Sequence, residues 1–369
     1  MNITILTAKR IISSLVQQQL DGKNPPPVFL WGPPGVGKSD ITRQVAKEKG
    51  IDVIDVRLGQ MDAVDMRGIP YVENGVTKWA VPEFFPRDPN TEAILFLDEL
   101  ASADPSIQVA GYQLILDNQV GEYKLPPKVY VCAAGNRAQD KAVSLPISSA
   151  LANRMMHLEV DASPQAWCAW AVTAGVAPEV VGFIRFCPKM LFALQEGECE
   201  RGWSSPRSWT RVSQILSYGL APDELRAGIV GLVGESAAAQ FLAYYKQSQA
   251  LGDIRAVMLD PKAKLKLPTK NDMLFAVATS IAYWAWRGET KDESAKLLDG
   301  FFRIGLQLPA PFAATAMIDA MSIGQDAIDQ RGTEQGKNVD TRAQQLIGHK
   351  LYPEWQNKFA SEMQKKKGA

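Results

Sequence analysis

The sequence is poor in the residues that bind transition metals or cross-link chains. Its 369 residues include four cysteines and only two histidines, His157 and His349, which lie far apart. The cysteines never form a CxxC pair and stand at Cys132, Cys168, Cys187 and Cys199. This spacing predicts neither a disulfide framework nor a zinc site.

An excess of one charge and a long apolar run are also missing. Lys and Arg total 40, as do Asp and Glu, so no overall field attracts nucleic acid or an anionic membrane surface. No apolar run reaches the roughly 20 residues that a membrane-spanning helix needs, and residues 1–10 do not resemble a signal peptide. We therefore expect a cytoplasmic protein without a membrane span, in which any polyanion binding comes from a local patch.

The first half of the chain alternates short apolar runs with helical stretches. Four of these runs predict strands, at Val28–Trp31, Asp52–Val56, Ala93–Leu97 and Val129–Ala134. The alternation predicts an α/β fold, in which a parallel sheet is sandwiched by helices. Three of the four predicted strands end at polar clusters, and such a sheet places its ligand at that edge.

The second half has a different character and contains no further convincing strand. After about Asp161 the sequence is rich in alanine, leucine and tryptophan, which predicts helices. A chain of this length exceeds one typical domain. The expected divisions are an α/β domain at 1–162, a helical domain at 163–255, further helices at 256–323, and a polar linker with a terminal helix at 324–369.

One segment has the pattern of a phosphate-binding loop, the P-loop. It follows the predicted strand Val28–Trp31, opens a helix to about Lys49, and reads Gly32, Pro33, Pro34, Gly35, Val36, Gly37, Lys38 and Ser39. The glycines allow backbone amides to turn toward a phosphate, and the helix N-terminus adds partial positive charge. Lys38 would bridge the β- and γ-phosphates of ATP, and the Ser39 hydroxyl would bind Mg²⁺.

Two later strand ends carry polar side chains suited to the same reaction. Asp98 and Glu99 close the third predicted strand, where Asp98 can hold Mg²⁺ and Glu99 can polarise the attacking water. Asn136 follows the fourth strand and could orient that water or contact the γ-phosphate. Acids after a strand are often only part of a solvated loop, and an Asn after a Gly is often only a turn residue. The P-loop, the two acids and Asn136 therefore indicate a nucleotide site only in combination.

With these elements in order, the chain resembles the AAA+ ATPases and, within them, the MoxR-type group. The resemblance covers residues 1 to about 323, and it implies a P-loop AAA+ sheet domain followed by an all-α lid and a C-terminal helical extension. It also implies two further catalytic arginines. Arg154 looks like the arginine finger that reaches a neighbouring subunit, and Arg207, after Ser205-Pro206, looks like sensor 2 of the lid.

Two expected hairpins strengthen the resemblance, and one departure weakens it. An Asn74-Gly75 turn predicts a hairpin, where this group carries an insert in its second helix, and residues 117–126 look like the hairpin before Asn136. Arg154 is followed by Met155-Met156-His157, where many relatives carry Phe-Asp. We interpret His157 as a packing or interface residue rather than a pH switch.

The resemblance implies a homo-oligomeric ring, most simply of six subunits, that remodels or assembles a protein client with a von Willebrand A domain partner. Two alternatives stay open: a DNA-directed motor or helicase loader, which the neutral charge disfavours, and a switch that uses ATP only to assemble. The Asn-Lys-x-Asp signature of GTPases is absent from the segment after Asn136. We therefore expect ATP and Mg²⁺ as ligands.

Overall fold

The structure is a computed structural model that describes residues 2–137, 147, 149–193, 201–322 and 342–367. The chain forms two compact units, Met1–Ser163 and Pro164–Ala369. The predicted polar linker, residues 324–341, lies outside the described residues.

Unit 1 is built on a six-stranded sheet in which every neighbouring pair of strands is parallel. In spatial order the strands are β1 (Asn2–Ile3), β10 (Met156–Val160), β2 (Val28–Trp31), β9 (Val129–Gly135), β6 (Ala93–Asp98) and β3 (Asp52–Arg57). The four predicted strands and the predicted α/β fold are confirmed. Strands β1 and β10 were not predicted.

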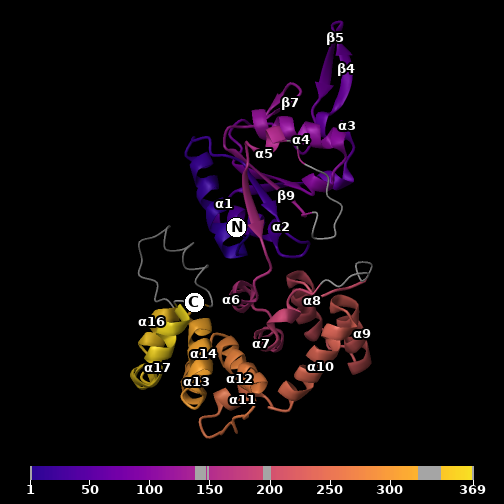
Figure 1. Cartoon of the computed structure of the whole chain (residues 1–369). Helices are drawn as coiled ribbons and strands as arrows, with labels where there is room; N and C mark the ends of the chain where they lie inside the picture. Colours follow the sequence, from indigo (N-terminus) through magenta and orange to yellow (C-terminus); the bar gives the residue numbers. More distant parts are fainter. Residues whose placement is uncertain (1, 138–146, 148, 194–200, 323–341, 368–369) are drawn as a thin grey trace. The chain divides into compact units, whose positions relative to one another are not determined.

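Helices cover both faces of this sheet (Figure 1). On one face α1 (Ile5–Leu20) packs beside α2 (Lys38–Lys49), and on the other α4 (Pro105–Asp117) packs beside the short α3 (Ala63–Arg67). The residues of β9 are all buried, as are those of β6 up to its last residue. This two-sided burial explains why these strands read as continuous apolar runs.

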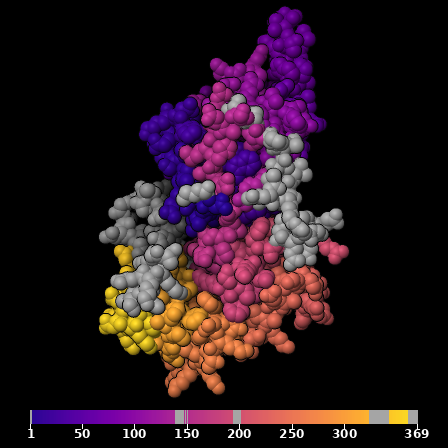
Figure 2. All heavy atoms as spheres, viewed as in Figure 1, coloured from indigo at the N-terminus to yellow at the C-terminus, as the bar shows by residue number. Residues whose placement is uncertain are grey.

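Two small hairpins extend unit 1 beyond the sheet. The larger joins β4 (Ile69–Glu73) to β5 (Val76–Ala80) and projects from the unit (Figures 1 and 2). At its turn, Asn74 and Gly75 both have positive φ, 53° and 75°, as a two-residue hairpin turn of the primed type requires. The smaller joins β7 (Gln119–Val120) to β8 (Tyr123–Lys124). Both predicted hairpins are confirmed.

Among its described residues, unit 2 consists of helices and the loops that join them, with one isolated β-bridge between Ala193 and Ser204. Its helices are α6 (Pro164–Ala174), α7 (Pro178–Phe186), α8 (Pro206–Leu216), α9 (Pro222–Val233), α10 (Glu235–Gln249), α11 (Ile254–Leu259), α12 (Asn271–Trp284), α13 (Lys291–Gly305), α14 (Ala310–Ser322), α16 (Arg342–Ile347) and α17 (Tyr352–Lys367). Irregular chain separates α11 from α12. The predicted all-α character of this half is confirmed.

The core of unit 2 is mainly apolar but contains one buried ion pair. In its first part Phe183 and Phe241 pack around the fully buried Trp209. Further along, Arg185 of α7 binds the carboxylate of Asp319 of α14 with both terminal nitrogens, and the second of these contacts measures 2.6 Å. Asp319 is only 4% exposed, so this pair ties the two helices together inside the core.

Candidate active site

The predicted P-loop lies between the end of β2 at Trp31 and the start of α2 at Lys38. Gly37 has φ 101°, a conformation that only glycine adopts without strain. At Gly32 the limit is space, because a Cβ there would lie 2.3 Å from the backbone oxygen of Val160. The sequence therefore needs glycine at these two positions for the loop to form.

Lys38 opens α2 and is buried, with 8% of its surface exposed. Its ammonium donates hydrogen bonds to the carbonyls of Gly32 at 2.5 Å and Pro33 at 3.0 Å. It also donates to Oδ1 of Asn136 at 2.9 Å. The structure thus brings Lys38 and Asn136 together from positions almost one hundred residues apart, as the sequence interpretation requires.

Ser39 and Asp98 form the second pair at this edge of the sheet. The Ser39 hydroxyl donates to Oδ2 of Asp98 at 3.0 Å. A hydroxyl and a carboxylate oxygen are hard ligands of the kind that Mg²⁺ takes, while its remaining positions are usually filled by water and substrate phosphates. These two residues therefore fit the predicted magnesium site.

Glu99 adopts an unusual backbone conformation directly after β6. Its φ is 60°, in the left-handed region, which costs a non-glycine residue about 1–2 kcal/mol. Its amide donates to Oδ1 of Asp98 at 3.0 Å. Its carboxylate lies against Gly59, beyond the end of β3, where a Cβ would stand 2.5 Å from Oε2 of Glu99. Strain of this kind persists where the surroundings hold it and is common at active sites.

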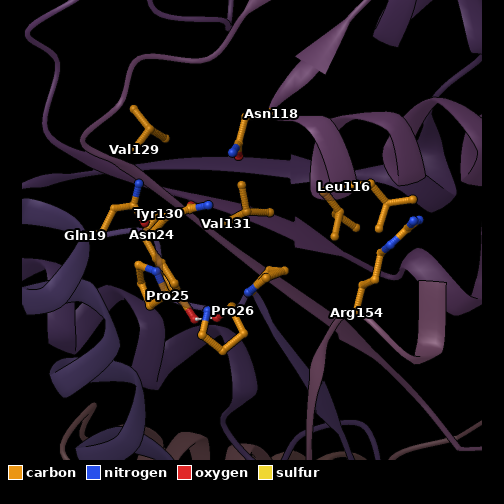
Figure 3. Close-up of a pocket in the computed structure, with 12 residues that line it drawn as sticks. Gln19, Asn24, Pro25, Pro26, Leu116, Asn118, Val129, Tyr130, Val131 and Arg154 are labelled. Carbon is orange, nitrogen blue, oxygen red and sulfur yellow. Dashed lines mark hydrogen bonds between the residues drawn. The ribbon is translucent and has the colours of Figure 1, made fainter. Parts of the chain in front are cut away.

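Arg154 does not join this group. It precedes β10 and lines a cavity of about 130 Å³, together with Leu116, Asn118 and the prolines before β2 (Figure 3). The cavity lies where β2 and β9 begin, whereas the P-loop follows the end of β2. The four residues of β2, at about 3.3 Å each, already separate the two edges by ~13 Å. Arg154 thus lies at the sheet edge opposite its own P-loop.

Arg207 lies in unit 2, in the first turn of α8. Ser205 caps that helix, because its side chain accepts a hydrogen bond from the amide of Ser208 and the Ser208 hydroxyl accepts one from the amide of Ser205. Pro206 occupies the first helical position, where proline is favoured. Arg207 itself is exposed. The Ser205-Pro206-Arg207 segment therefore begins a helix.

His157 lies in β10 with its ring stacked near Trp31. Trp31 Nε1 donates to Nδ1 of His157 at 2.8 Å, and Nε2 of His157 is 2.8 Å from the carbonyl of Ala152, in α5 (Ser149–Ala152). With Nδ1 accepting, Nε2 carries the proton that reaches Ala152. The histidine thus joins β2 to the chain just before β10, although it is exposed.

The sequence interpretation gave no role to two residues beside the site. The Thr42 hydroxyl donates to the carbonyl of Lys38 at 3.2 Å within α2. Arg137, next to Asn136, forms an ion pair with Asp161 at 2.8 Å. The position of Arg137 directly after Asn136 was the one signal in the sequence.

Cys132 lies in β9 and is not reactive. Burial raises the pKa of its thiol to about 12, although a hydrogen bond with Thr42 acts to lower it, so this cysteine is neutral and unreactive.

Comparison with known proteins agrees with this geometry. Residues 28–158 match the family model described as ATPase family associated with various cellular activities (AAA). The match spans the P-loop, Asp98, Glu99, Asn136 and Arg154. Residues 28–158 of unit 1 are thus similar to an AAA-type ATPase domain, and this similarity indicates nucleotide binding and ATP hydrolysis in general terms. No curated protein matches the sequence.

Solved structures with some likeness include several forms of RuvB from Thermotoga maritima. One point mutant of that protein is 16% identical, with 75% of each chain covered and a TM-score of 0.36. A second point mutant is 15% identical, with 89% of this chain and 88% of that chain covered and a TM-score of 0.37. The RuvB Holliday junction branch migration motor is 15% identical, with 77% and 76% covered and a TM-score of 0.35.

Among the described residues, no helix has both the length and the apolar character that crossing a membrane would require.

Proposed function

We propose that the cluster at the carboxyl edge of the sheet binds ATP with Mg²⁺ and hydrolyses it. The observation that carries this proposal is the pair of contacts from Lys38 to Asn136 and from Ser39 to Asp98. Backbone amides of the loop from Gly32 to Ser39 hold the phosphates, and Lys38 exchanges its neutral oxygen partners for phosphate oxygens. Ser39 and Asp98 would hold Mg²⁺, which would supply positive charge against the transferring phosphate.

Glu99 and Asn136 act on the attacking water. Glu99 accepts the proton of the water as it attacks, and its fixed position beside Gly59 limits where the carboxylate can point. Asn136, adjacent to Lys38, orients the water or the γ-phosphate. Arg207 in α8 serves as sensor 2 and reports nucleotide state to the helical region.

Arg154 completes the site of a neighbouring subunit in this proposal. Phosphoryl transfer spreads negative charge on equatorial oxygens, which a cation from outside the P-loop can stabilise by about 10³–10⁵ in rate. Because Arg154 lies at the opposite edge of its own sheet, it suits a neighbour's site better than its own. Repeated head-to-tail contacts of this kind close into a ring, and we propose six subunits.

The output we propose is remodelling or assembly of a protein complex, with a von Willebrand A domain partner, in the cytoplasm. The β4–β5 hairpin supports a protein partner. Among the described residues, ten large apolar side chains are exposed, and half of them lie on α3 or this hairpin: Val64, Ile69, Tyr71, Val72 and Val76. Exposed apolar patches of this kind mark protein contacts. Glu73 and Lys78 neutralise each other there, which gives the hairpin no attraction for nucleic acid.

Within unit 2 we propose a helical lid at 163–255 and a separate helical extension from 256. The proposed boundary between residues 255 and 256 falls within α11 (Ile254–Leu259), and irregular chain follows that helix. In this arrangement, hydrolysis changes the angle between the sheet domain and the lid, and the hairpin moves with it.

The experiment that tests this function is steady-state ATP hydrolysis measured against protein concentration. It compares the wild type with Arg154→Ala, Lys38→Ala and their mixture. We expect specific activity to rise with concentration, and the mixture to recover turnover that neither variant has alone. Activity independent of concentration, with no recovery on mixing, would refute the role of Arg154 across an interface. Stimulation by DNA would favour a DNA-directed motor instead.

A further inference from the structure

Arg137 lies beside the proposed site, yet the proposed mechanism does not use it. It follows Asn136 after the end of β9, and its side chain is only 14% exposed. Its Nη2 lies 2.8 Å from Oδ1 of Asp161, and its Nη1 lies 3.9 Å from Oε2 of Glu159. Glu159 belongs to β10, and Asp161 directly follows that strand. The ion pair therefore connects the end of β9 with the end of β10.

These two strands are not neighbours, because β2 lies between them. The residue after β2 is Gly32, the first of the P-loop. Its amide donates to the carbonyl of Gly135 in β9 at 3.4 Å, and its Cα faces the carbonyl of Val160 so closely that no Cβ would fit. Arg137 thus reaches across the entry of the P-loop, from one flanking strand to the other.

Asp161 also lies two residues before Ser163, the last residue of unit 1. Residues 161–163 connect β10 to α6, the first helix of unit 2. Asp161 is held on its other side by β1, since its amide donates to the carbonyl of Ile3 at 3.4 Å and its carboxylate accepts a hydrogen bond from the side-chain amide of Asn2. A displacement of Asp161 therefore moves the start of the connecting segment.

We propose that Arg137 is a positioning residue that transmits the state of the nucleotide site to the connecting segment 161–163. This inference rests on the proposed function of Lys38 and Asn136. When phosphate oxygens take over Lys38, the hydrogen bond from Lys38 to Asn136 is released and Asn136 turns toward the nucleotide. Arg137, one peptide bond away, then shifts with it and carries Asp161 along through the ion pair.

Arginine suits this role better than lysine or a neutral residue. Its guanidinium can hold Asp161 and lie near Glu159 at the same time, with a rigid planar group that passes on a change of direction. Partial burial makes the pair stronger than a fully exposed one. Lysine at this position would keep the charge and one contact, so it should retain part of the coupling.

The test measures amide hydrogen exchange of the full chain in the segment that contains residues 161–163, with ADP and with a non-hydrolysable ATP analogue. The variants are Arg137→Ala, Arg137→Lys and, as a matched control, Lys128→Ala, which removes an ion pair with Glu92 before β9 at the other sheet edge. Affinity for the analogue is measured in parallel. Should Arg137→Ala fail to fold, Asp161→Asn weakens the same pair.

In the wild type and in Lys128→Ala we expect the two nucleotides to give different exchange in this segment. In Arg137→Ala the difference should vanish. The affinity for the analogue should change by no more than about 5-fold relative to the wild type, which is the lower end of allosteric coupling. Arg137→Lys should restore part of the difference, which a merely structural role would not predict. A difference that persists in Arg137→Ala, or none in a wild type that binds the analogue, overturns the inference. A wild type that binds no nucleotide overturns the proposed function itself.

Discussion

Lys38 in unit 1 and Asp319 in unit 2 are both charged and buried, but their partners differ. Lys38 in unit 1 is 8% exposed and is held by neutral oxygens of Gly32, Pro33 and Asn136. Asp319 in unit 2 is 4% exposed and is held by the guanidinium of Arg185. Hydrogen bonds to neutral oxygens can be exchanged for bonds to a charged ligand, whereas the buried ion pair of Asp319 with Arg185 serves the fold. The comparison separates a binding residue from a structural one.

The largest effect should come from Lys38→Ala. This change removes the cation that holds the β- and γ-phosphates, so turnover should be undetectable and ATP affinity should fall at least about 100-fold, since each contact to a charged group contributes about 1.5–3 kcal/mol. Calorimetric titration with ATP measures the affinity. Lys47→Ala, at an exposed position on the same helix, is the control and should bind ATP like the wild type. Equal affinity of both variants would contradict the assignment.

Glu99→Gln should separate binding from chemistry within unit 1. The amide keeps the shape of the side chain but cannot accept the proton of the attacking water, so hydrolysis should fall by about 10²–10⁴-fold while ATP stays bound. Phosphate release and nucleotide retention measure the two effects. Glu92→Gln removes a carboxylate of an exposed surface pair and should change neither. Turnover retained by Glu99→Gln would show that another group activates the water.

Asp319→Ala should damage the fold of unit 2 without touching the nucleotide site. It leaves the guanidinium of Arg185 buried without its carboxylate, which typically costs about 3–5 kcal/mol. Urea unfolding followed by tryptophan fluorescence should show this loss, whereas ATP affinity should match that of the wild type. Replacing both partners by apolar residues, Arg185→Met with Asp319→Leu, should restore most of the stability. A normal unfolding midpoint for Asp319→Ala would remove the contrast with Lys38.

The smallest effect should be a dependence of the stability of unit 2 on pH. Burial lowers the pKa of His349 from its ordinary value of 6.5, although Asp299 opposes this, and Nδ1 of His349 accepts a hydrogen bond from the amide of Leu351. Hydrogen bonds and charge from Lys350 and His349 lower the pKa of Asp299 despite its burial. Both folded-state pKa values lie below the unfolded ones. Stability should therefore be full above pH 6.5 and decrease on acidification.

Unfolding curves at about pH 7.5 and about pH 5.5, on either side of the ordinary histidine pKa, measure this dependence. His349→Gln keeps a donor toward Asp299 but does not titrate, so its stability should fall less between the two pH values than that of the wild type. The same loss in both proteins would mean that other groups are responsible. ATP affinity should be independent of the His349→Gln change.

The sequence allowed most candidate site residues to be chosen, because the P-loop and the strand ends are local patterns. Lys38, Ser39, Asp98 and Asn136 were each identified from neighbouring residues, and the parallel sheet brings them together. Strand β1 has two residues, which is too short for any periodicity, and β10 reads as the end of an apolar run. Their pairing depends on contacts between distant parts of the chain.

Arg137 and the pair of Arg185 with Asp319 could not be found in the same way. Arginines and aspartates are common on protein surfaces, and nothing in the local sequence distinguishes a buried one. Arg137 and Asp161 are 24 positions apart in the chain, and Arg185 and Asp319 are 134 positions apart. Only the packed structure reveals such pairs.

The order of the strands in the sheet also limits the order in which the parts of unit 1 can fold. Strand β10 lies between β1 and β2, which precede it by more than one hundred residues. Pairing of such distant segments slows folding, since a long loop must close before the contacts form. During synthesis the sheet can close only after Val160 has emerged, and until then the P-loop lacks one of its two flanking strands. A growing chain that does not yet include β10 therefore cannot form the complete nucleotide site.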